Sequence, residues 1–323
     1  MNRRPEVVPD PLCEAAVSII RALTGRAATA ERIQHGVMTF KYTVDSGGGA
    51  RFIVRFYPPG REDVVEYEPD VVRRCRSGGL RVPEVVADSR SGPPAPLAYM
   101  AYRMINGIAL RNRLADMGDR EMHSVCRSVA EQLHAMAEVR IDGYGELTSV
   151  HEAQYTTWQA FIRAAFEGGI DAAGRRMLFK DPLIETLQTV CDHIYRFAAP
   201  QAPVLTWGDV SPDNIIVHGG RLAGLIDFES VLGGEPELNL GYVRARYRET
   251  PFYKALLEHW PYVDHDQPRT ALYVVVRGLR LLIHRCEPLP TGERRQGTES
   301  FLSDFEAAAN ELRAWIFGDL DDR

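Results

Sequence analysis

One segment of the chain carries three side chains whose types and spacing suit phosphoryl transfer. Asp209 and Asn214 are separated by four residues, and Asp227 follows the apolar run Leu222–Ile226. Transfer of a phosphoryl group to an alcohol needs a carboxylate that orients the hydroxyl and accepts its proton. It also needs oxygen ligands that hold Mg²⁺ against the phosphates. We expect Asp209 to take the first role, and Asn214 and Asp227 to bind the metal.

A predicted hairpin supports this interpretation. Ile215–His218 and Leu222–Ile226 are joined by Gly219-Gly220, which supply the positive φ angles of a tight turn. Such a hairpin brings Asn214 and Asp227 to the same end, where they can share one metal ion. The alternative is a plain turn in which Asp209 and Asn214 cap neighbouring backbone, since Asp, Asn, Ser and Pro all favour turns. The hairpin and the strand-end position of Asp227 favour the first interpretation.

The chain before this segment is rich in predicted strands. A helix at Arg61–Ser77, with Pro69 inside it as a first turn or a kink, lies between the third and fourth of them. A short amphipathic helix at Pro11–Leu23 precedes the strands. The predicted strands are Arg32–Gly36, Val37–Val44, Arg51–Tyr57, Glu84–Asp88 and Leu97–Met104. This order predicts an antiparallel sheet that carries one helix.

The chain after Gly107 is predicted to be mainly helical. Apolar residues recur there at helical spacing, as in Met122, Val125, Val129 and Leu133. A compact β patch formed by Val204–Trp207 and the hairpin interrupts the helices. The later helices are predicted at Thr157–Glu167, Leu183–Phe197, Thr270–Arg285 and Phe301–Phe317. We therefore expect an α+β chain with a β-rich half at 1–105 and a larger helical half at 106–323.

The chain resembles the aminoglycoside phosphotransferase family, the antibiotic and metabolite kinases that share the protein-kinase fold. The family pattern H-G-D-x-x-x-x-N, followed by I-D-W or I-D-F, is matched at Asp209, Asn214 and Asp227. The resemblance covers most of residues 30–245. It implies a protein-kinase-like two-lobed fold. The N-lobe would contain a small antiparallel β-sheet with one helix, and this lobe would bind the nucleotide. The mainly helical C-lobe would hold the catalytic loop and the acceptor.

The same resemblance assigns a nucleotide site to the N-lobe. Arg55, in Phe52-Ile-Val-Arg55, matches the basic strand residue that contacts the nucleotide phosphates in the family. Glu68 matches the helix glutamate that pairs with this base. Tyr102, Met104 and Ile105 lie in a segment that resembles the hinge, and they are expected to bind the nucleotide base.

Each of these assignments has an ordinary alternative in the residues alone. Arg55 suits a surface strand that pairs with a neighbouring acid. Glu66 competes with Glu68, since a solvated helix face explains both acids. Met104 and Ile105 at a strand end suit a plain hydrophobic core.

The chain departs from the family pattern in the catalytic segment and in the phosphate loop. Trp207 stands where the family has histidine, and Asn239 stands where the pattern G-D-P-x-x-D-L has its second aspartate. Both positions are expected to brace the catalytic loop. Only Gly36 marks the region of the phosphate loop. These departures motivate a further alternative, a pseudokinase that binds nucleotide without turnover.

The amino-acid composition limits the classes of partner and the cellular environment that we expect for this protein. The 323 residues carry a net charge of -6, which argues against nucleic acid as the main partner because phosphate backbones attract clustered Lys and Arg. Five separated cysteines without a C-x-x-C pair suggest reduced thiols in a cytoplasmic protein. The first thirty residues lack the apolar core of a signal peptide. The apolar stretch Leu272–Ile283 is interrupted by Arg277 and Arg280, so we expect no membrane span.

The expected reaction is transfer of the γ-phosphate of ATP or GTP, with Mg²⁺, to a hydroxyl of an antibiotic-like acceptor. The alternative acceptor is an ordinary metabolite such as an amino alcohol or a sugar. Four acids near the motif, Asp213, Glu229, Glu235 and Glu237, could form an acidic wall for a cationic acceptor. The sequence leaves the acceptor, the choice of nucleotide and the oligomeric state open.

Overall fold

The structure, a computed structural model, describes residues 10–34, 38–175, 179–197, 200, 202–261, 268–285 and 299–321. The chain forms two compact units. The first contains the described chain up to Arg73 together with Pro83–Ile105, and the second contains Arg74–Val82 and the described chain from Asn106 onward. The C-terminal end of the helix at Glu62–Ser77 therefore belongs to the second unit.

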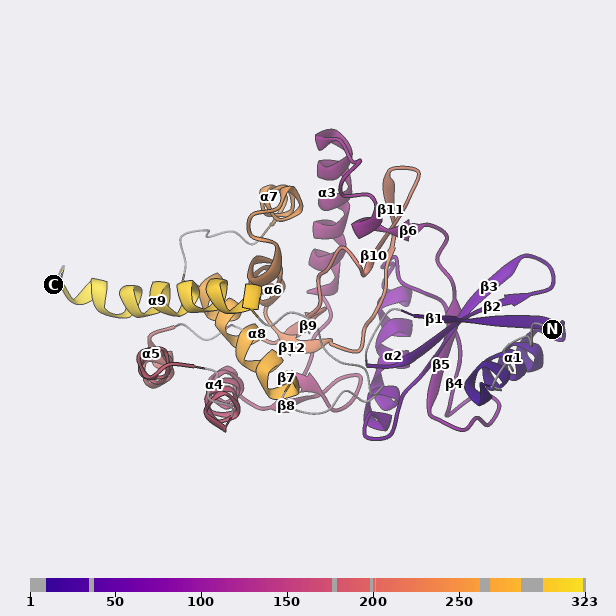
Figure 1. The fold of residues 1–323 in the computed structure, drawn as a ribbon, viewed down its shortest axis with the longest axis horizontal. Coiled ribbons are helices and arrows are strands. Elements are labelled where there is room, and N and C mark those ends of the chain that lie inside the picture. Colours follow the sequence, from indigo (N-terminus) through magenta and orange to yellow (C-terminus); the bar gives the residue numbers. More distant parts are fainter. Residues whose placement is uncertain are drawn as a thin grey trace, which may run out of the picture. The chain divides into compact units, whose positions relative to one another are not determined.

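The first unit is built on an antiparallel sheet (Figure 1). Five of the described strands form it in the order β1-β2-β3-β5-β4. They are β1 (Ala28–Ile33), β2 (Phe40–Ser46), β3 (Ala50–Phe56), β4 (Val85–Asp88) and β5 (Tyr99–Arg103). Strands β2 and β3 form a hairpin, in which Ser46 pairs with Ala50 across Gly47–Gly49. The first strand begins earlier than predicted, at Ala28, and Gly36 lies outside the described residues.

Helices pack on both faces of this sheet (Figure 1). The apolar stripe of α1 (Pro11–Thr24) joins Val44, Phe52, Val54 and Phe56 in one buried cluster. Alternate residues of a strand point to opposite faces, so Arg55 of β3 lies on the other side. There it reaches Glu68 of α2 (Glu62–Ser77). The sheet thus carries α1 on one face and the predicted helix, α2, on the other.

Pro69 lies inside α2, which continues to Ser77. A proline in a helix removes one backbone hydrogen bond to the preceding turn. The residues around it are nevertheless anchored by burial, because Val65, Glu68 and Val72 are almost fully inaccessible to solvent. Tertiary contacts therefore hold the helix through a residue that by itself predicts an interruption.

The second unit is mainly helical and centres on α8 (Arg269–Arg285), which packs against α4, α6 and α9 (Figure 1). Gly241 of α6 lets this helix approach α8 closely, since a Cβ atom there would lie 2.3 Å from the Cβ of Tyr273. The other helices are α3 (Asp119–Met136), α4 (Trp158–Arg175), α5 (Asp181–Asp192), α6 (Glu237–Tyr247), α7 (Pro251–Glu258) and α9 (Glu299–Asp321), with 3₁₀ turns at Leu110–Asn112 and Ile194–Arg196. Of the helices that the structure describes, none has the length and apolar character needed to cross a bilayer.

Two small sheets hold the segment that carries Asp209, Asn214 and Asp227 in this unit. One has the order β11-β10-β6 and contains the predicted hairpin, while the other has the order β8-β7-β12-β9. Their strands are β6 (Ile108–Ala109), β7 (Tyr144–Leu147), β8 (Ala153–Tyr155), β9 (Val204–Thr206), β10 (Ile215–His218), β11 (Arg221–Leu225) and β12 (Leu232–Gly234). The prediction of one β patch is wrong, because β9 pairs with β12 and not with the hairpin. Strands of two to four residues are too short to show alternation.

The cysteines in the described part of the chain are free thiols. Cys75, Cys126 and Cys191 are buried, and Cys13 is half-buried. Burial raises the pKa of both Cys75 and Cys126 to about 12, so these thiols stay protonated and unreactive at neutral pH. Cys286 lies outside the described residues.

Candidate active site

The loop between β9 and β10 brings Asp209 and Asn214 into direct contact. The side-chain nitrogen of Asn214 donates to the Asp209 carboxylate (Nδ2 to Oδ2, 2.9 Å) and to the Asp209 backbone oxygen (3.2 Å). Asn214 is buried, whereas the Asp209 side chain keeps 31% of its surface exposed. Because the Asn214 nitrogen is committed to Asp209, the amide oxygen is the atom that a hard cation would bind.

The hairpin places Asp227 beside this loop. The Ile226 amide donates to the Asn214 backbone oxygen (2.9 Å), so Asn214 and Asp227 lie at the same, open end of β10 and β11. Asp227 has a φ of +69°, and among the described residues it is the non-glycine with a positive φ. Such a conformation costs roughly 1–2 kcal/mol outside glycine, and it is common at functional sites.

Trp207 and Asn239, the two departures from the family pattern, both brace the loop. The indole nitrogen of Trp207 donates to the backbone oxygen of Asp227 (3.1 Å), and its buried ring stacks on Phe228 with 5.9 Å between centroids. The Gly208 amide donates to the side-chain oxygen of Asn239 on α6 (3.1 Å). The altered residues therefore tie the Asp209 loop to the Asp227 segment and to α6.

Gly208 itself is required by the shape of this turn. Its φ is +75°, and a Cβ atom there would lie 2.2 Å from the Ser230 backbone oxygen. Any other residue would push the loop away from the Ser230 backbone, which follows Asp227 in the chain. The glycine before Asp209 thus has a steric role in bringing the two segments together.

Arg277 is part of the site although its sequence position gave no hint of this. It projects from α8 and donates to the Asp209 carboxylate (Nη2 to Oδ1, 3.1 Å) and to the Gly208 backbone oxygen (Nη1, 3.0 Å). Its guanidinium carbon lies 4.4 Å from the ring centroid of Tyr242. The signal available in the sequence was an arginine inside an otherwise apolar helix, which excludes a membrane span but does not point to Asp209.

The predicted nucleotide residues lie in the first unit, where Arg55 and Glu68 form a buried ion pair. Arg55 Nη1 contacts both Glu68 carboxylate oxygens, at 2.7 and 3.0 Å, and the two side chains are 1% and 0% exposed. The Tyr57 hydroxyl donates to the same carboxylate (2.5 Å). Glu66, the alternative partner, is exposed. These three hydrogen bonds to the Glu68 carboxylate offset part of the cost of removing the two charges from water.

Of the hinge-like residues, Tyr102 lies near the end of β5, and Met104 and Ile105 follow this strand directly. Tyr102 is buried and pairs with Ile53 and Val85 of the neighbouring strands. Met104 and Ile105 are half-buried, and the Met104 amide donates to the Arg51 backbone oxygen (2.9 Å). The role of these residues in binding a nucleotide base stays a prediction.

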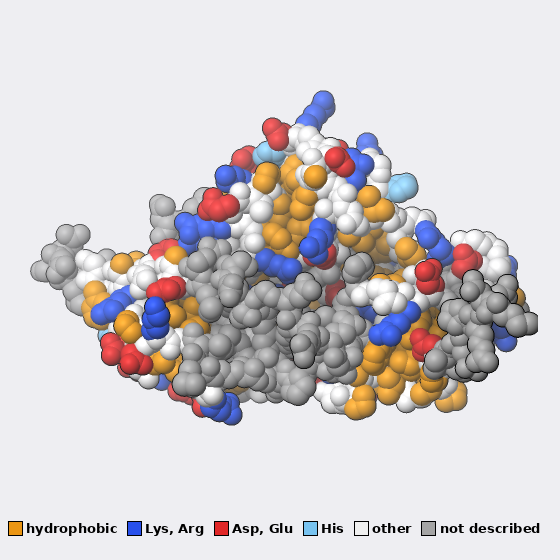
Figure 2. Space-filling model, in the orientation of Figure 1, with side chains coloured by type: hydrophobic (Ala, Val, Ile, Leu, Met, Phe, Trp, Pro, Cys, Tyr) orange, Lys and Arg blue, Asp and Glu red, His pale blue; other side chains and the backbone are white. Residues whose placement is uncertain are grey.

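The acids proposed as a wall are largely neutralised by their surroundings. Glu235 pairs with Arg269 (2.7 Å), and Asp213 pairs with Arg111 (3.0 Å). Burial, together with the negative charge of Glu235, raises the pKa of Glu237 to about 7. On the face drawn in Figure 2, acidic and basic side chains of the described residues are interspersed. Three of the four acids, Asp213, Glu235 and Glu237, are therefore at least partly neutralised by their surroundings.

The raised pKa of Glu237 predicts a pH-dependent stability. Because the folded protein holds this proton more tightly than the unfolded chain, Glu237 supports folding at pH 4 and loses that contribution as pH rises through about 7. Replacing it by glutamine removes the titration. We expect the free energy of unfolding of the Glu237→Gln variant, minus that of the wild type, to increase by about 2 kcal/mol between pH 4 and 8.

Urea unfolding at several pH values measures this difference. Glu249→Gln is the matched control, since its side chain is 86% exposed. A Glu237→Gln difference that stays flat with pH, or that tracks the Glu249→Gln control, would contradict the prediction.

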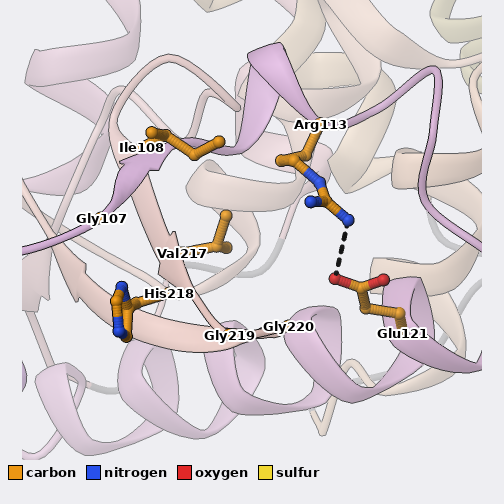
Figure 3. Close-up of a pocket in the computed structure, with 8 residues that line it drawn as sticks. All are labelled: Gly107, Ile108, Arg113, Glu121, Val217, His218, Gly219 and Gly220. Carbon is orange, nitrogen blue, oxygen red and sulfur yellow. Dashed lines mark ion pairs between the residues drawn. The ribbon is translucent and has the colours of Figure 1, made fainter.

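A cavity of about 190 Å³ lies at the other end of the β10–β11 hairpin (Figure 3). It is lined by Gly107, Val217 and the turn Gly219-Gly220, and its wall contains an ion pair between Arg113 and Glu121 (3.5 Å). Asn214 and Asp227 are at the open end of the hairpin, away from this turn. The cavity is therefore separate from the predicted catalytic residues.

Comparison with known proteins decides the family. A sequence profile of the phosphotransferase enzyme family (APH) matches residues 29–273. The chain belongs to this family. The match contains the Asp209 loop, the β10–β11 hairpin and Asp227, so the motif identified in the sequence lies within the family region.

The proteins to which this chain is similar include antibiotic kinases. The hygromycin-B 4-O-kinase of Escherichia coli is 22% identical over 206 residues, which cover 62% of this chain and 57% of that protein. The crystal structure of a mutant aminoglycoside phosphotransferase APH(4)-Ia, in a ternary complex with ADP and hygromycin B, superimposes with a TM-score of 0.68 at 18% identity. The superposition covers 93% of this chain and 98% of the chain in that crystal structure.

A second structural relative has a different described activity. A Thermobifida fusca protein described as a fructosamine-3-kinase superimposes with a TM-score of 0.62 at 17% identity, covering 92% of this chain and 98% of that one. The predicted α+β, protein-kinase-like fold is confirmed by these similarities. At such low identity the structural likeness establishes the fold alone.

Proposed function

We propose that this protein is a small-molecule kinase that transfers the γ-phosphoryl group of ATP or GTP to a hydroxyl group. The observation that carries the proposal is the linkage of Asp209, Asn214 and Asp227 at the open end of one hairpin. Asp209 is the partly exposed carboxylate, so it is proposed to orient the acceptor hydroxyl and to accept its proton. Catalysis then consists mainly of positioning and charge neutralisation.

Asn214 and Asp227 are the proposed ligands of Mg²⁺. An amide oxygen and a carboxylate are the hard donors that this ion prefers, and the fixed contacts of both residues hold them near Asp209. When bound, Mg²⁺ supplies positive charge that neutralises the phosphate oxygens. Arg55, held by Glu68, is proposed to contact the nucleotide phosphates, and Tyr102, Met104 and Ile105 to contact its base.

An antibiotic-like acceptor is favoured by the named relatives. The curated relative is a hygromycin-B kinase, and the superimposed APH(4)-Ia structure contains ADP and hygromycin B. Another superimposed aminoglycoside phosphotransferase contains GDP, which motivates testing both nucleotides. The match spans just over half of the curated relative, so activity and acceptor are both proposals for this chain.

A metabolite kinase is the second candidate. The fructosamine-3-kinase neighbour and the pairing of Glu235 and Asp213 with arginines favour it, because a polycationic antibiotic would gain from unpaired acids. The pseudokinase alternative is disfavoured, since Trp207 and Asn239 still brace the loop that carries Asp209.

Purified protein with ATP or GTP and Mg²⁺ tests the proposal against a panel of hydroxylated acceptors. The panel should contain hygromycin B, other aminoglycosides, a macrolide, a fructosamine, an amino alcohol and a sugar. We expect acceptor-dependent release of nucleoside diphosphate and a phosphorylated product seen by mass spectrometry. We expect at least one antibiotic-like acceptor to be turned over faster than the metabolites.

Resistance conferred on a sensitive host supports the antibiotic assignment, whereas turnover of the fructosamine or the amino alcohol alone overturns it in favour of the metabolite kinase. Tight nucleotide binding without transfer to any member of a broad acceptor panel supports the pseudokinase and contradicts the proposed reaction.

A further inference from the structure

We propose that Arg277 is a positioning residue of the phosphoryl transfer, which holds the Asp209 carboxylate in its productive orientation. The inference rests on the proposed function, because it assigns a role to Arg277 in the same reaction. It goes beyond the motif, since Arg277 lies 68 residues after Asp209 on a helix outside the catalytic loop.

The guanidinium of Arg277 contacts both the Asp209 carboxylate and the backbone of the loop that carries Asp209. One nitrogen donates to the Asp209 carboxylate (3.1 Å), and the other donates to the Gly208 backbone oxygen (3.0 Å). A planar guanidinium can make these two contacts at a fixed angle to each other, whereas the ammonium of lysine is a point charge without a fork. Arg277 therefore fixes the carboxylate relative to the turn that carries it.

Asn214 holds the carboxylate from the other side. Its nitrogen contacts Oδ2, while Arg277 contacts Oδ1, so each oxygen of Asp209 has one donor from the protein. A carboxylate oxygen has two lone-pair directions, which leaves acceptor capacity for a substrate hydroxyl. Two donors on opposite oxygens set the rotation of the carboxylate, which decides where that hydroxyl must sit.

The guanidinium is itself held in place. It lies over the Tyr242 ring at 4.4 Å, and the Arg277 side chain is 18% exposed. α8 is a central helix of the second unit, with Leu272–Val276 and Leu279 buried. The charge thus projects from a rigid element, as required of a group that orients a catalytic residue.

Arg280 provides a matched control on the same helix. It donates to the Tyr242 hydroxyl (2.9 Å), pairs with Glu146 and is 14% exposed, so its environment resembles that of Arg277. Within the described part of the chain, Arg280 contacts Tyr242, Glu146 and the Phe161 ring, and not the Asp209 loop. Structural loss in α8 should affect both arginines, while loss of base positioning should follow Arg277 alone.

The experiment compares Arg277→Met with Arg280→Met at saturating nucleotide and acceptor. We expect kcat of Arg277→Met to fall about 10- to 100-fold, with the KM for nucleotide unchanged, because misplacing a reactive group slows the step without weakening nucleotide binding. Arg280→Met is expected to keep kcat within about threefold of wild type while sharing any loss of thermal stability.

Chemical rescue separates positioning from packing. Guanidinium ion at non-denaturing concentrations should restore part of the kcat of Arg277→Ala and leave Arg280→Ala unchanged. If Arg277→Met fails to fold, Arg277→Lys keeps the charge and length, and its kcat should still fall because lysine lacks the fork.

Three results would overturn the inference: wild-type kcat in Arg277→Met or Arg277→Lys, equal losses in the Arg277 and Arg280 variants, or no rescue by guanidinium. A wild-type protein that turns over no acceptor would instead overturn the proposed function, and the two failures are distinguished by the wild-type assay.

Discussion

Replacing Asp209 by alanine is expected to lower kcat by about 1,000-fold or more while leaving nucleotide affinity nearly intact. A positioned general base contributes about 10²- to 10⁴-fold, and Asp209 is also the proposed guide of the acceptor hydroxyl. Its carboxylate is partly exposed and is held by Asn214 and Arg277, neither of which can accept a proton in its place. Steady-state kinetics and calorimetric nucleotide titration measure the two quantities.

Asp213 supplies the control for this prediction. It is a carboxylate of the same loop with similar exposure, 38% against 31%, but it pairs with Arg111. Asp213→Asn should keep kcat within about threefold of wild type. Equal turnover by wild type and Asp209→Ala would exclude Asp209 as the base, and a parallel loss in Asp213→Asn would point to damage of the loop as a whole.

Replacing Asp227 by asparagine is expected to lower the affinity for the Mg²⁺–nucleotide complex by about tenfold or more, and to lower turnover further. Asparagine tolerates the positive φ of this position, so the variant removes charge without adding the strain that alanine would introduce. The Trp207 contact goes to the backbone oxygen and is retained. A metal-bound triphosphate gains from a full negative charge on the ligand that alanine or asparagine cannot supply.

Nucleotide titrations with and without Mg²⁺ test this role. Affinity without Mg²⁺ should be unchanged or higher in Asp227→Asn, since a negative charge near the phosphates has been removed. Asp227→Gly is the second variant, because it relieves the strained φ and lacks any ligand atom. An unaltered Mg²⁺ dependence in both variants would show that Asp227 does not hold the metal.

The parts of the site that the sequence predicted are those that lie close together along the chain. Asp209, Asn214 and Asp227 are joined by a loop and a hairpin, so their spacing and the Gly219-Gly220 turn were enough to predict their proximity. The Arg55–Glu68 pair could be chosen over Glu66 only through the resemblance, because helix periodicity near Pro69 leaves both acids possible.

The parts that the sequence missed depend on tertiary contacts. Arg277 reaches Asp209 from α8, and nothing in the apolar pattern of that helix specifies which loop its arginine meets. The sequence also did not indicate that Arg269 and Arg111, distant along the chain, pair with Glu235 and Asp213, two of the four acids considered as a wall. The short strands β6, β7, β8 and β12 are defined by their partners and not by their own two to four residues.

Because of its position, α8 is expected to affect both the thermal stability of the protein and the rate of the proposed reaction. One face of this helix fills the centre of the helical unit, where Gly241 permits close approach, and Arg277 on the same helix holds the proposed base. A substitution in that interior that displaced α8 would also displace Arg277 and, through it, the Asp209 carboxylate that is proposed to orient the attacking hydroxyl. We therefore expect substitutions in this interior that alter the thermal stability of the protein to alter its proposed turnover as well.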